Sequence, residues 1–332
     1  MTAVVGRPIR LPRIGQNRSS WPAWLVLALV LGSSWVLVNS TGGDFITIQN
    51  LQNIAQRSVA LGLVATGQTL VILAGSLDMS VAYTVSITAI AASVVMDGRP
   101  DRIAYGVAVA LAVGACVGLA NGLVIAGLGV NAFIATFGIA LIVRGALNAT
   151  FDNVAGSVPT DFQVLGYGTV AGLPVGILLL AGVVAVAWYL MHRARFGYHV
   201  YAVGGGLETA RLSGIRTRSV LIAVHVLCGV CAALSGVFLA SRLGAGSPWV
   251  GPQGAYDLES IAAVVLGGVA LGGGRGRLLG TISAVLMLAV VDSVFNHFEA
   301  DSFLRTLGRG VIIIGAVALY ARRGERGWQA PS

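Results

Sequence analysis

The chain has 332 residues, of which 56% are hydrophobic and only 10% are charged. Soluble domains carry about 25% charged residues, so this chain is too apolar to cover a water-facing surface, and lipid must be its solvent. The net charge of +8 comes from 21 basic residues, all of them arginine, most of which lie in short segments beside apolar runs. That distribution is typical of membrane topology and argues against a nucleic-acid-binding surface.

Ten apolar runs come near the roughly 17 to 25 residues that a membrane span requires. They lie at 22–40, 54–75, 80–96, 103–127, 131–149, 171–191, 219–241, 258–272, 278–297 and 303–321. The sequence therefore predicts an all-α polytopic membrane protein, with a tail at 1–21, a transmembrane domain at 22–322 and a second tail at 323–332. The runs at 80–96 and 258–272 are short, and short glycine-interrupted runs indicate broken or re-entrant helices.

The placement of the arginines predicts the orientation of these spans. With the N-terminus inside, the inside segments hold most of the arginines, whereas the outside loops hold most of the acids. Because cytoplasmic loops carry the excess of arginine, and because the number of spans is even, both termini are predicted to be cytoplasmic.

A weak internal repeat relates the two halves of the chain. The segment 131–138, NAFIATFG, is similar to 301–308, DSFLRTLG, and each opens the last span of a five-span half. An odd number of spans in each half inverts the second copy, so we expect a five-plus-five inverted repeat.

Motifs for catalysis or nucleotide binding are missing from the sequence. With no lysine, the chain cannot contain a Walker A motif, and it has no His-Glu-x-x-His zinc motif. Its four histidines are scattered, and Cys228 and Cys231 are interpreted as small apolar residues on one helix face rather than a redox or metal pair. An enzymatic function therefore has little support, and no metal site is expected.

Polar residues within the apolar runs are costly in lipid and are therefore candidates for function. They are Gln68, Asp78, Asn121, Asn131, Arg144, Asn148, Asp292 and Arg309. The alternative is a structural role, in interhelical hydrogen bonding or snorkelling. For Arg144, Asn148 and Asp292 the structural and functional interpretations have equal weight. Asp78 lies between two runs, where its carboxylate is expected to cap the start of the following helix.

The longest inside segment, 192–218, contains a predicted short helix. The pattern from Leu207 to Leu212 suits a helix that Gly204 to Gly206 precede and Gly214 ends. Its basic flanks place it at the cytoplasmic surface. Such a helix is either a docking element for another protein or a plain turn, and the residue pattern leaves both open.

Several stretches of the chain resemble the ribose-type permeases of ABC importers, which serve ribose, xylose, arabinose, galactose and related solutes. In the inside segment these are Arg195-Phe-Gly, Val200-Tyr-Ala-Val-Gly-Gly and Glu208-Thr-Ala-Arg-Leu-Ser-Gly-Ile215. The others are 67–80, 131–138 with Arg144-Gly145, and 256–280. The resemblance covers about residues 50 to 320 in order. The chain departs from the family at Gly206 and Leu207, where Asn and Pro are usual, and at Ser76 and Ala82, where Gly is usual.

The resemblance implies a permease subunit of the bacterial inner membrane that forms the route for a monosaccharide or similar small polar solute. It implies three partners: a second permease copy, an extracytoplasmic solute-binding protein, and a cytoplasmic ATPase that holds ATP and magnesium, so that this chain needs no cofactor. It also implies a loop that docks the ATPase, comprising Gly204, Gly205, Leu207, Glu208, Ala210, Arg211, Leu212, Ser213, Gly214 and Ile215. The family's route runs along the dimer axis, and candidates for it are Gln68, Ser76 and Asp78 on one side, and Glu259, Ser260 and Gly267 on the other.

Two other classes of membrane protein remain as alternatives. An ion-coupled secondary transporter usually places acids or broken-helix carbonyls at the membrane midplane, where Asp292 is the main acid of this chain. A membrane enzyme would need a catalytic constellation, which the sequence does not contain. Co-purification of an ATPase would separate an ABC permease from a secondary transporter.

Overall fold

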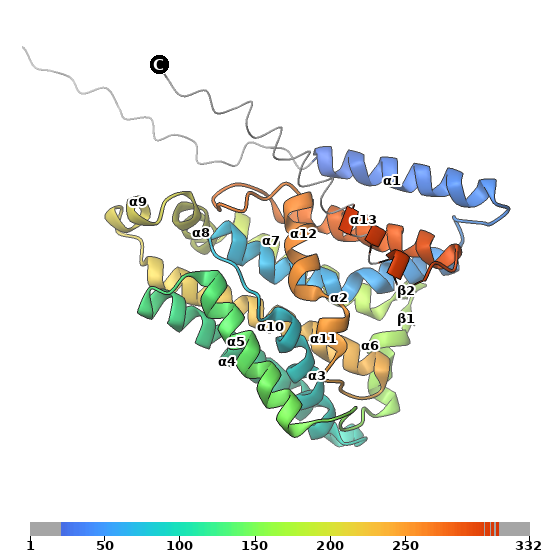
Figure 1. Cartoon of the computed structure of the whole chain (residues 1–332), viewed down its shortest axis with the longest axis horizontal. Helices are drawn as coiled ribbons and strands as arrows, with labels where there is room; N and C mark the ends of the chain where they lie inside the picture. The colour runs from blue at the N-terminus through green and yellow to red at the C-terminus, as the bar shows by residue number, and fades with distance from the viewer. Residues whose placement is uncertain (1–20, 302, 306, 309, 312–332) are drawn as a thin grey trace, which may run out of the picture.

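The computed structural model describes residues 21–301, 303–305, 307, 308, 310 and 311. Its helices are α1 Trp21–Ser40, α2 Ile48–Leu73, α3 Val81–Met96, α4 Ile103–Leu128, α5 Ala132–Thr150, α6 Val164–Tyr167, α7 Val175–His192, α8 Arg195–Gly205, α9 Leu207–Leu212, α10 Thr217–Leu243, α11 Val250–Gln253, α12 Tyr256–Leu266 and α13 Leu278–His297. Two short strands, β1 Thr169–Val170 and β2 Leu173–Pro174, pair antiparallel. The prediction of an all-α polytopic protein is therefore confirmed (Figure 1).

Six helices in the described part of the chain are long and apolar enough to cross a membrane. They are α1, α4 with the turn before it, α5, α7, α10 and α13. Helix α2 is long enough, but its polar residues lower its hydropathy, and α3 has only 16 residues. The tenth predicted run, 303–321, lies mainly outside the described residues, as do the tails 1–20 and 323–332. That the chain has ten spans, arranged as an inverted repeat, remains a prediction.

The predicted run 258–272 is not a single helix. Helix α12 has 11 residues, which at a rise of 1.5 Å per residue reach only about half of a 30 Å hydrocarbon core. It ends at Leu266 with Gly267 as its C-cap, and Gly268 follows with a φ of +85°, a backbone conformation that favours glycine. The chain then runs as a loop to Leu278. The glycines that made this run look interrupted therefore terminate the helix.

Helix α10 lies at the centre of the bundle and packs against α4, α2 and α3. Its contact with α4 is a seam of glycines at four-residue spacing. An added Cβ on Gly118 would lie 2.2 Å from the backbone oxygen of His225, and one on Gly114 would lie 2.4 Å from the backbone oxygen of Gly229. Only glycine permits backbones this close, so the seam fixes α4 and α10 as one pair.

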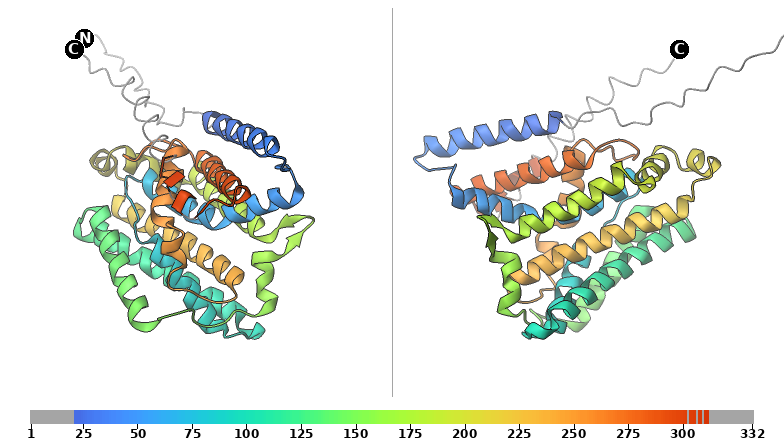
Figure 2. Two further views of the ribbon diagram at one scale, coloured as in Figure 1. Left: turned by 45° about the vertical axis from the view of Figure 1, so that its right-hand side comes forward. Right: turned by 180° about the vertical axis from the view of Figure 1, so that it is seen from behind.

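The loops lie at two ends of the bundle. Figure 1 shows α8 and α9 at one end and the β1–β2 hairpin at the other, and Figure 2 shows the same separation from behind. At the hairpin end, Gln52 Nε2 donates to Gly172 O over 2.9 Å, so α2 begins there. The arginine-rich segment 193–218 thus lies at the opposite end from the start of α2.

Candidate functional site

The helix predicted from Leu207 to Leu212 is confirmed as α9, with the same bounds. Gly214, which follows it, has a φ of +81°, as expected of a residue that ends a helix. Ala210 is buried and anchors α9 against the bundle, whereas Leu207 and Leu212 are 52% and 82% exposed. Each of these exposed leucines, on a short helix at the end of the bundle, is available to contact a protein partner.

Three glycine segments meet behind α9 at the level of the backbone. An added Cβ on Gly204 would lie 1.9 Å from Leu73 O and 2.6 Å from Gly274 N, and one on Gly274 would lie 2.7 Å from Gly205 Cα. Gly274 N donates a hydrogen bond to Leu73 O over 2.9 Å. We call this contact the glycine junction. It joins the ends of α2 and α8 to the loop that precedes α13.

A side-chain hydrogen bond reinforces the glycine junction from α8. The Tyr201 hydroxyl donates to Gly276 O over 2.9 Å. Burial raises the pKa of Tyr201, so this hydroxyl keeps its proton at neutral pH and remains a donor. Together with the glycine contacts, it fixes α8 to the loop 269–277.

The linker between α2 and α3 leads from the glycine junction to a buried polar network around Asp78. Oδ1 of Asp78 accepts from Ser80 N over 2.9 Å and from Ser80 Oγ over 2.6 Å. Nδ2 of Asn121, on α4, lies 3.2 Å from both carboxylate oxygens, and Nδ1 of His225, on α10, lies 3.4 Å from Oδ2. Asp78 was predicted to cap the start of α3, but the only backbone N–H that its carboxylate accepts from is that of Ser80, one residue before the helix. The carboxylate also joins α4 and α10.

The other side of the His225 ring faces Ser76. Its Nε2 lies 2.9 Å from Ser76 Oγ, so Ser76, His225 and Asp78 form a hydrogen-bonded series. Hydrolases use such a series for catalysis, but all three side chains are less than 5% exposed, and none lines a described cavity. The series therefore clamps the linker against α10.

The remaining polar candidates occupy different positions. Gln68 is fully buried and its Oε1 accepts from Cys228 Sγ over 3.8 Å, whereas Asn131 caps α5 by accepting from Phe133 N. Arg309 lies outside the described residues. Ser260 is buried and donates to Asp257 O, and an added Cβ on Gly267 would lie 2.4 Å from Thr281 N, which makes Gly267 a packing contact with α13.

Helix α5 exposes polar side chains along an apolar span. Arg144 and Asn148 are exposed, on a face that also carries Leu141. An arginine in a membrane-spanning helix costs about 2.5–3.5 kcal/mol at the centre of the bilayer. This face of α5 is therefore better suited to border protein or water than lipid alone.

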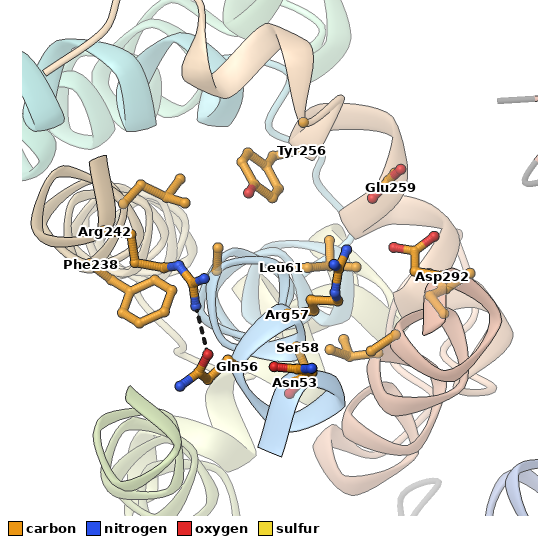
Figure 3. Close-up of a pocket in the computed structure, with 16 residues that line it drawn as sticks. Asn53, Gln56, Arg57, Ser58, Leu61, Phe238, Arg242, Tyr256, Glu259 and Asp292 are labelled. Atoms are coloured by element: carbon orange, nitrogen blue, oxygen red, sulfur yellow. Dashed lines mark hydrogen bonds between the residues drawn. The ribbon is translucent and has the colours of Figure 1, made fainter. Parts of the chain in front are cut away.

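Glu259 lines a cavity in the half of the bundle nearest the hairpin. The cavity has a volume of about 340 Å³ and lies between α2, α10, α12 and α13. Figure 3 shows side chains from all four helices around it. A second cavity of about 340 Å³, between α13 and the start of α2, shares Asn53 and Arg57 with the first. Of the predicted route residues, Glu259 lines the first cavity and Ser76 and Asp78 belong to the buried polar network. Gln68, Ser260 and Gly267 lie in neither place.

The comparisons with known proteins agree with this architecture. Residues 50–317 match the family described as branched-chain amino acid transport system / permease component. The chain is 37% identical over 304 residues to the ribose import permease protein of Escherichia coli K12, covering 89% of this chain and 94% of that protein. It is 30% identical over 336 residues to the galactose/methyl galactoside import permease protein of Salmonella typhimurium, covering 92% and 98%.

A third relative is the L-arabinose transport system permease protein of Escherichia coli K12, 33% identical over 286 residues and covering 85% of this chain and 86% of that protein. No solved structure matches the chain. The family match and the relatives both extend over most of the chain, through the linker, α8, α9 and the cavity. The chain therefore belongs to the family of ABC importer permeases that contains these sugar permeases.

Proposed function

We propose that this protein is the membrane permease of an ABC importer for a neutral monosaccharide. The observation that carries the proposal is its identity of 30% to 37%, over most of each chain, to permeases named for ribose, galactose and arabinose. The solute would be delivered by a binding protein at the hairpin end, and transport would be driven by an ATPase at the α8–α9 end. A second permease copy would cover the α5 face that carries Arg144 and Asn148.

Helix α9 is the proposed docking site of the ATPase. It combines exposed Leu207 and Leu212 with Glu208 and Arg211, whose charged groups are 4.0 Å apart, on a surface that the glycine junction connects to α2. Exposed apolar side chains beside charged ones are typical of a protein interface. The proposal extends to the whole loop from Gly204 to Ile215.

Charge reversal on α9 tests this docking site and the function together. Glu208→Arg is expected to lower sugar uptake and ATPase co-purification by about tenfold or more, because a reversed charge at a complementary interface is repelled. Asp152→Arg, a reversal at an exposed acid of the opposite end, should leave ATPase association unchanged. Undiminished uptake in a fully assembled Glu208→Arg complex would remove α9 from the interface. A wild-type preparation that carries no ATPase would favour a secondary transporter.

The proposed orientation places the α8–α9 end in the cytoplasm. Ser213→Cys, at an exposed position beside α9, should react with a membrane-impermeant maleimide only after cells are permeabilised. Asp152→Cys should react in intact cells. Cys116 is replaced by serine in both variants, and native Cys228 and Cys231 are buried. Labelling of Ser213→Cys from outside intact cells would reverse the topology.

A further inference from the structure

The turn between α7 and α8 carries a group of exposed aromatic and cationic side chains. They are Tyr189, Arg193, Arg195, Tyr198 and His199, and we call them the basic corner. We propose that the basic corner binds the headgroup of one anionic phospholipid of the cytoplasmic leaflet per permease copy. This rests on the proposed function, which gives the orientation and assigns the second copy to α5, but names no lipid site.

Helix α7 brings the basic corner to the level of the lipid headgroups. Its 18 apolar residues extend about 27 Å at a rise of 1.5 Å per residue, close to the thickness of a 30 Å hydrocarbon core. It begins directly after β2 of the hairpin and ends at His192. Arg193 and Arg195 therefore lie where the chain leaves the hydrocarbon, at the end proposed to be cytoplasmic.

Helix α7 lies on the outside of the bundle, away from α5. Figure 1 shows α5 at the front and α7 at the back, and the view from behind in Figure 2 brings α7 to the front. Helix α7 packs against α2, α6 and α8, whereas α5 packs against α3 and α4. Leu178, Val186 and Tyr189 are exposed along α7. Because the second copy is assigned to the α5 face, this exposed side of α7 borders lipid, and acyl chains can lie along it.

The positive charges of the basic corner have no acidic neighbours nearby in the sequence. No Asp or Glu occurs between Asp161 and Glu208, and the ion pairs of the described residues include neither Arg193 nor Arg195. A guanidinium group binds phosphate through two parallel N–H donors, so two arginines two residues apart match a phosphate headgroup. An anionic phospholipid supplies the negative charge that this part of the chain lacks.

Helix stability and topology account for only part of the basic corner. A cation just after α7 is favoured by the helix dipole, which explains Arg193. Arg195 is the first residue of α8, where the positive end of the dipole disfavours a cation. Membrane topology requires positive charge near the end of a span, but it does not require tyrosines beside it. Tyr189 and Tyr198 flank the arginines, and tyrosine rings favour the headgroup level.

Helix α8 separates the basic corner from the proposed ATPase site on α9. Its 11 residues extend about 16 Å. The helix is held in place because Val200 and Tyr201 are buried and the Tyr201 hydroxyl donates to Gly276 O. The basic corner can therefore hold a lipid headgroup while the ATPase occupies α9.

Lipid binding to the purified permease–ATPase complex tests the basic corner. The delipidated complex in detergent is titrated with dioleoyl phosphatidylglycerol or dioleoyl phosphatidylcholine, which share their acyl chains, and bound lipids are counted by native mass spectrometry. The first phosphatidylglycerol per permease chain should bind about tenfold more tightly than phosphatidylcholine, because each arginine near an anionic headgroup strengthens binding about fivefold. Arg193→Gln/Arg195→Gln should abolish this preference, whereas Arg193→Lys/Arg195→Lys should keep most of it.

The matched control is Arg216→Gln/Arg218→Gln. These two arginines have the same spacing, are exposed and precede most of α10 in the same inside segment, so the variant should keep the wild-type preference. Equal loss in the two pairs would indicate diffuse attraction to the whole arginine-rich end and would overturn the site. Equal binding of the two lipids by the wild type, or displacement of the lipid by millimolar glycerol 3-phosphate, would also overturn it. Arg193→Gln alone, with about a fivefold loss expected, is the second variant if the double variant does not assemble.

Sugar uptake distinguishes failure of this site from failure of the proposed function. Normal uptake by the wild-type complex, without any preference for phosphatidylglycerol, would defeat the lipid site alone. A complex that prefers phosphatidylglycerol at the basic corner but takes up no sugar would defeat the proposed function and leave the lipid site standing.

Discussion

Gly204→Ala is expected to reduce solute uptake by at least about tenfold while the protein still reaches the membrane. The added methyl would lie 1.9 Å from Leu73 O and 2.6 Å from Gly274 N, both backbone atoms that no rotamer change can move. Overpacking of this kind costs about 1–3 kcal/mol and displaces backbone. The displaced segment is the end of α8, so α9 should lose its fixed position relative to α2. Uptake, ATPase stimulation by solute and thermal unfolding of the purified complex measure the effect.

The adjacent residue supplies the matched control. An added Cβ on Gly205 meets nothing within 4 Å, so Gly205→Ala should unfold as the wild type does. Gly274→Ala, which is crowded and has a φ of +67°, and Gly272→Ala, which is uncrowded, form a second pair on the facing loop. If Gly204→Ala unfolds at the same temperature as Gly205→Ala and takes up solute as the wild type does, the glycine junction has no part in coupling.

Asp78→Ala is expected to give the largest loss of folded protein among single substitutions in the linker. The change leaves Asn121 Nδ2 and Ser80 N with fewer acceptors in a fully buried site, and each unsatisfied buried group costs about 1–3 kcal/mol. Asp78→Asn should fall between Ala and the wild type, because it keeps one oxygen acceptor but points an amide NH₂ at the NH₂ of Asn121. Yield of monodisperse protein and its unfolding temperature measure both.

Exchange of the two residues tests the network more sharply. In the double variant Asp78→Asn/Asn121→Asp, a carboxylate at position 121 can accept from the new amide at 78, so stability should recover relative to either single substitution. A coupling free energy of about 0.5–3 kcal/mol is typical of residues in one hydrogen-bond network. Strictly additive effects in the cycle would mean that Asp78 does not act through Asn121.

Local features of the bundle were predictable from sequence. Helix α9 was predicted with its bounds, because glycines flank it on both sides and Leu207 to Leu212 has no helix breaker. The apolar runs located the long helices, because the ability to span a membrane depends on one contiguous stretch of residues. The run 258–272 was predicted to be interrupted at its glycines, and α12 does end at Leu266, just before Gly267 and Gly268.

The contacts between distant segments were not predictable from sequence. Asp78 was selected as a polar residue between apolar runs, but its partners Asn121 and His225 are 43 and 147 residues away. In the sequence His225 is one of four scattered histidines. Only the structure shows that its ring lies between Ser76 and Asp78. The glycines at 204 and 274 looked like separate turns, because a glycine's lack of a side chain gives no sign of which backbone it will meet.

The α4–α10 seam has a consequence for how the protein is made. Gly114 and Gly118 pack against Gly229 and His225, which are synthesised more than 100 residues later. At bacterial rates of translation this separation is a delay on the order of ten seconds. During that interval the residues of α10 that pack against the glycine face of α4 do not yet exist. The central pair can therefore assemble only after α10 has been made, and a ribosome that stalls between α4 and α10 leaves the backbone groove of α4 without its partner helix.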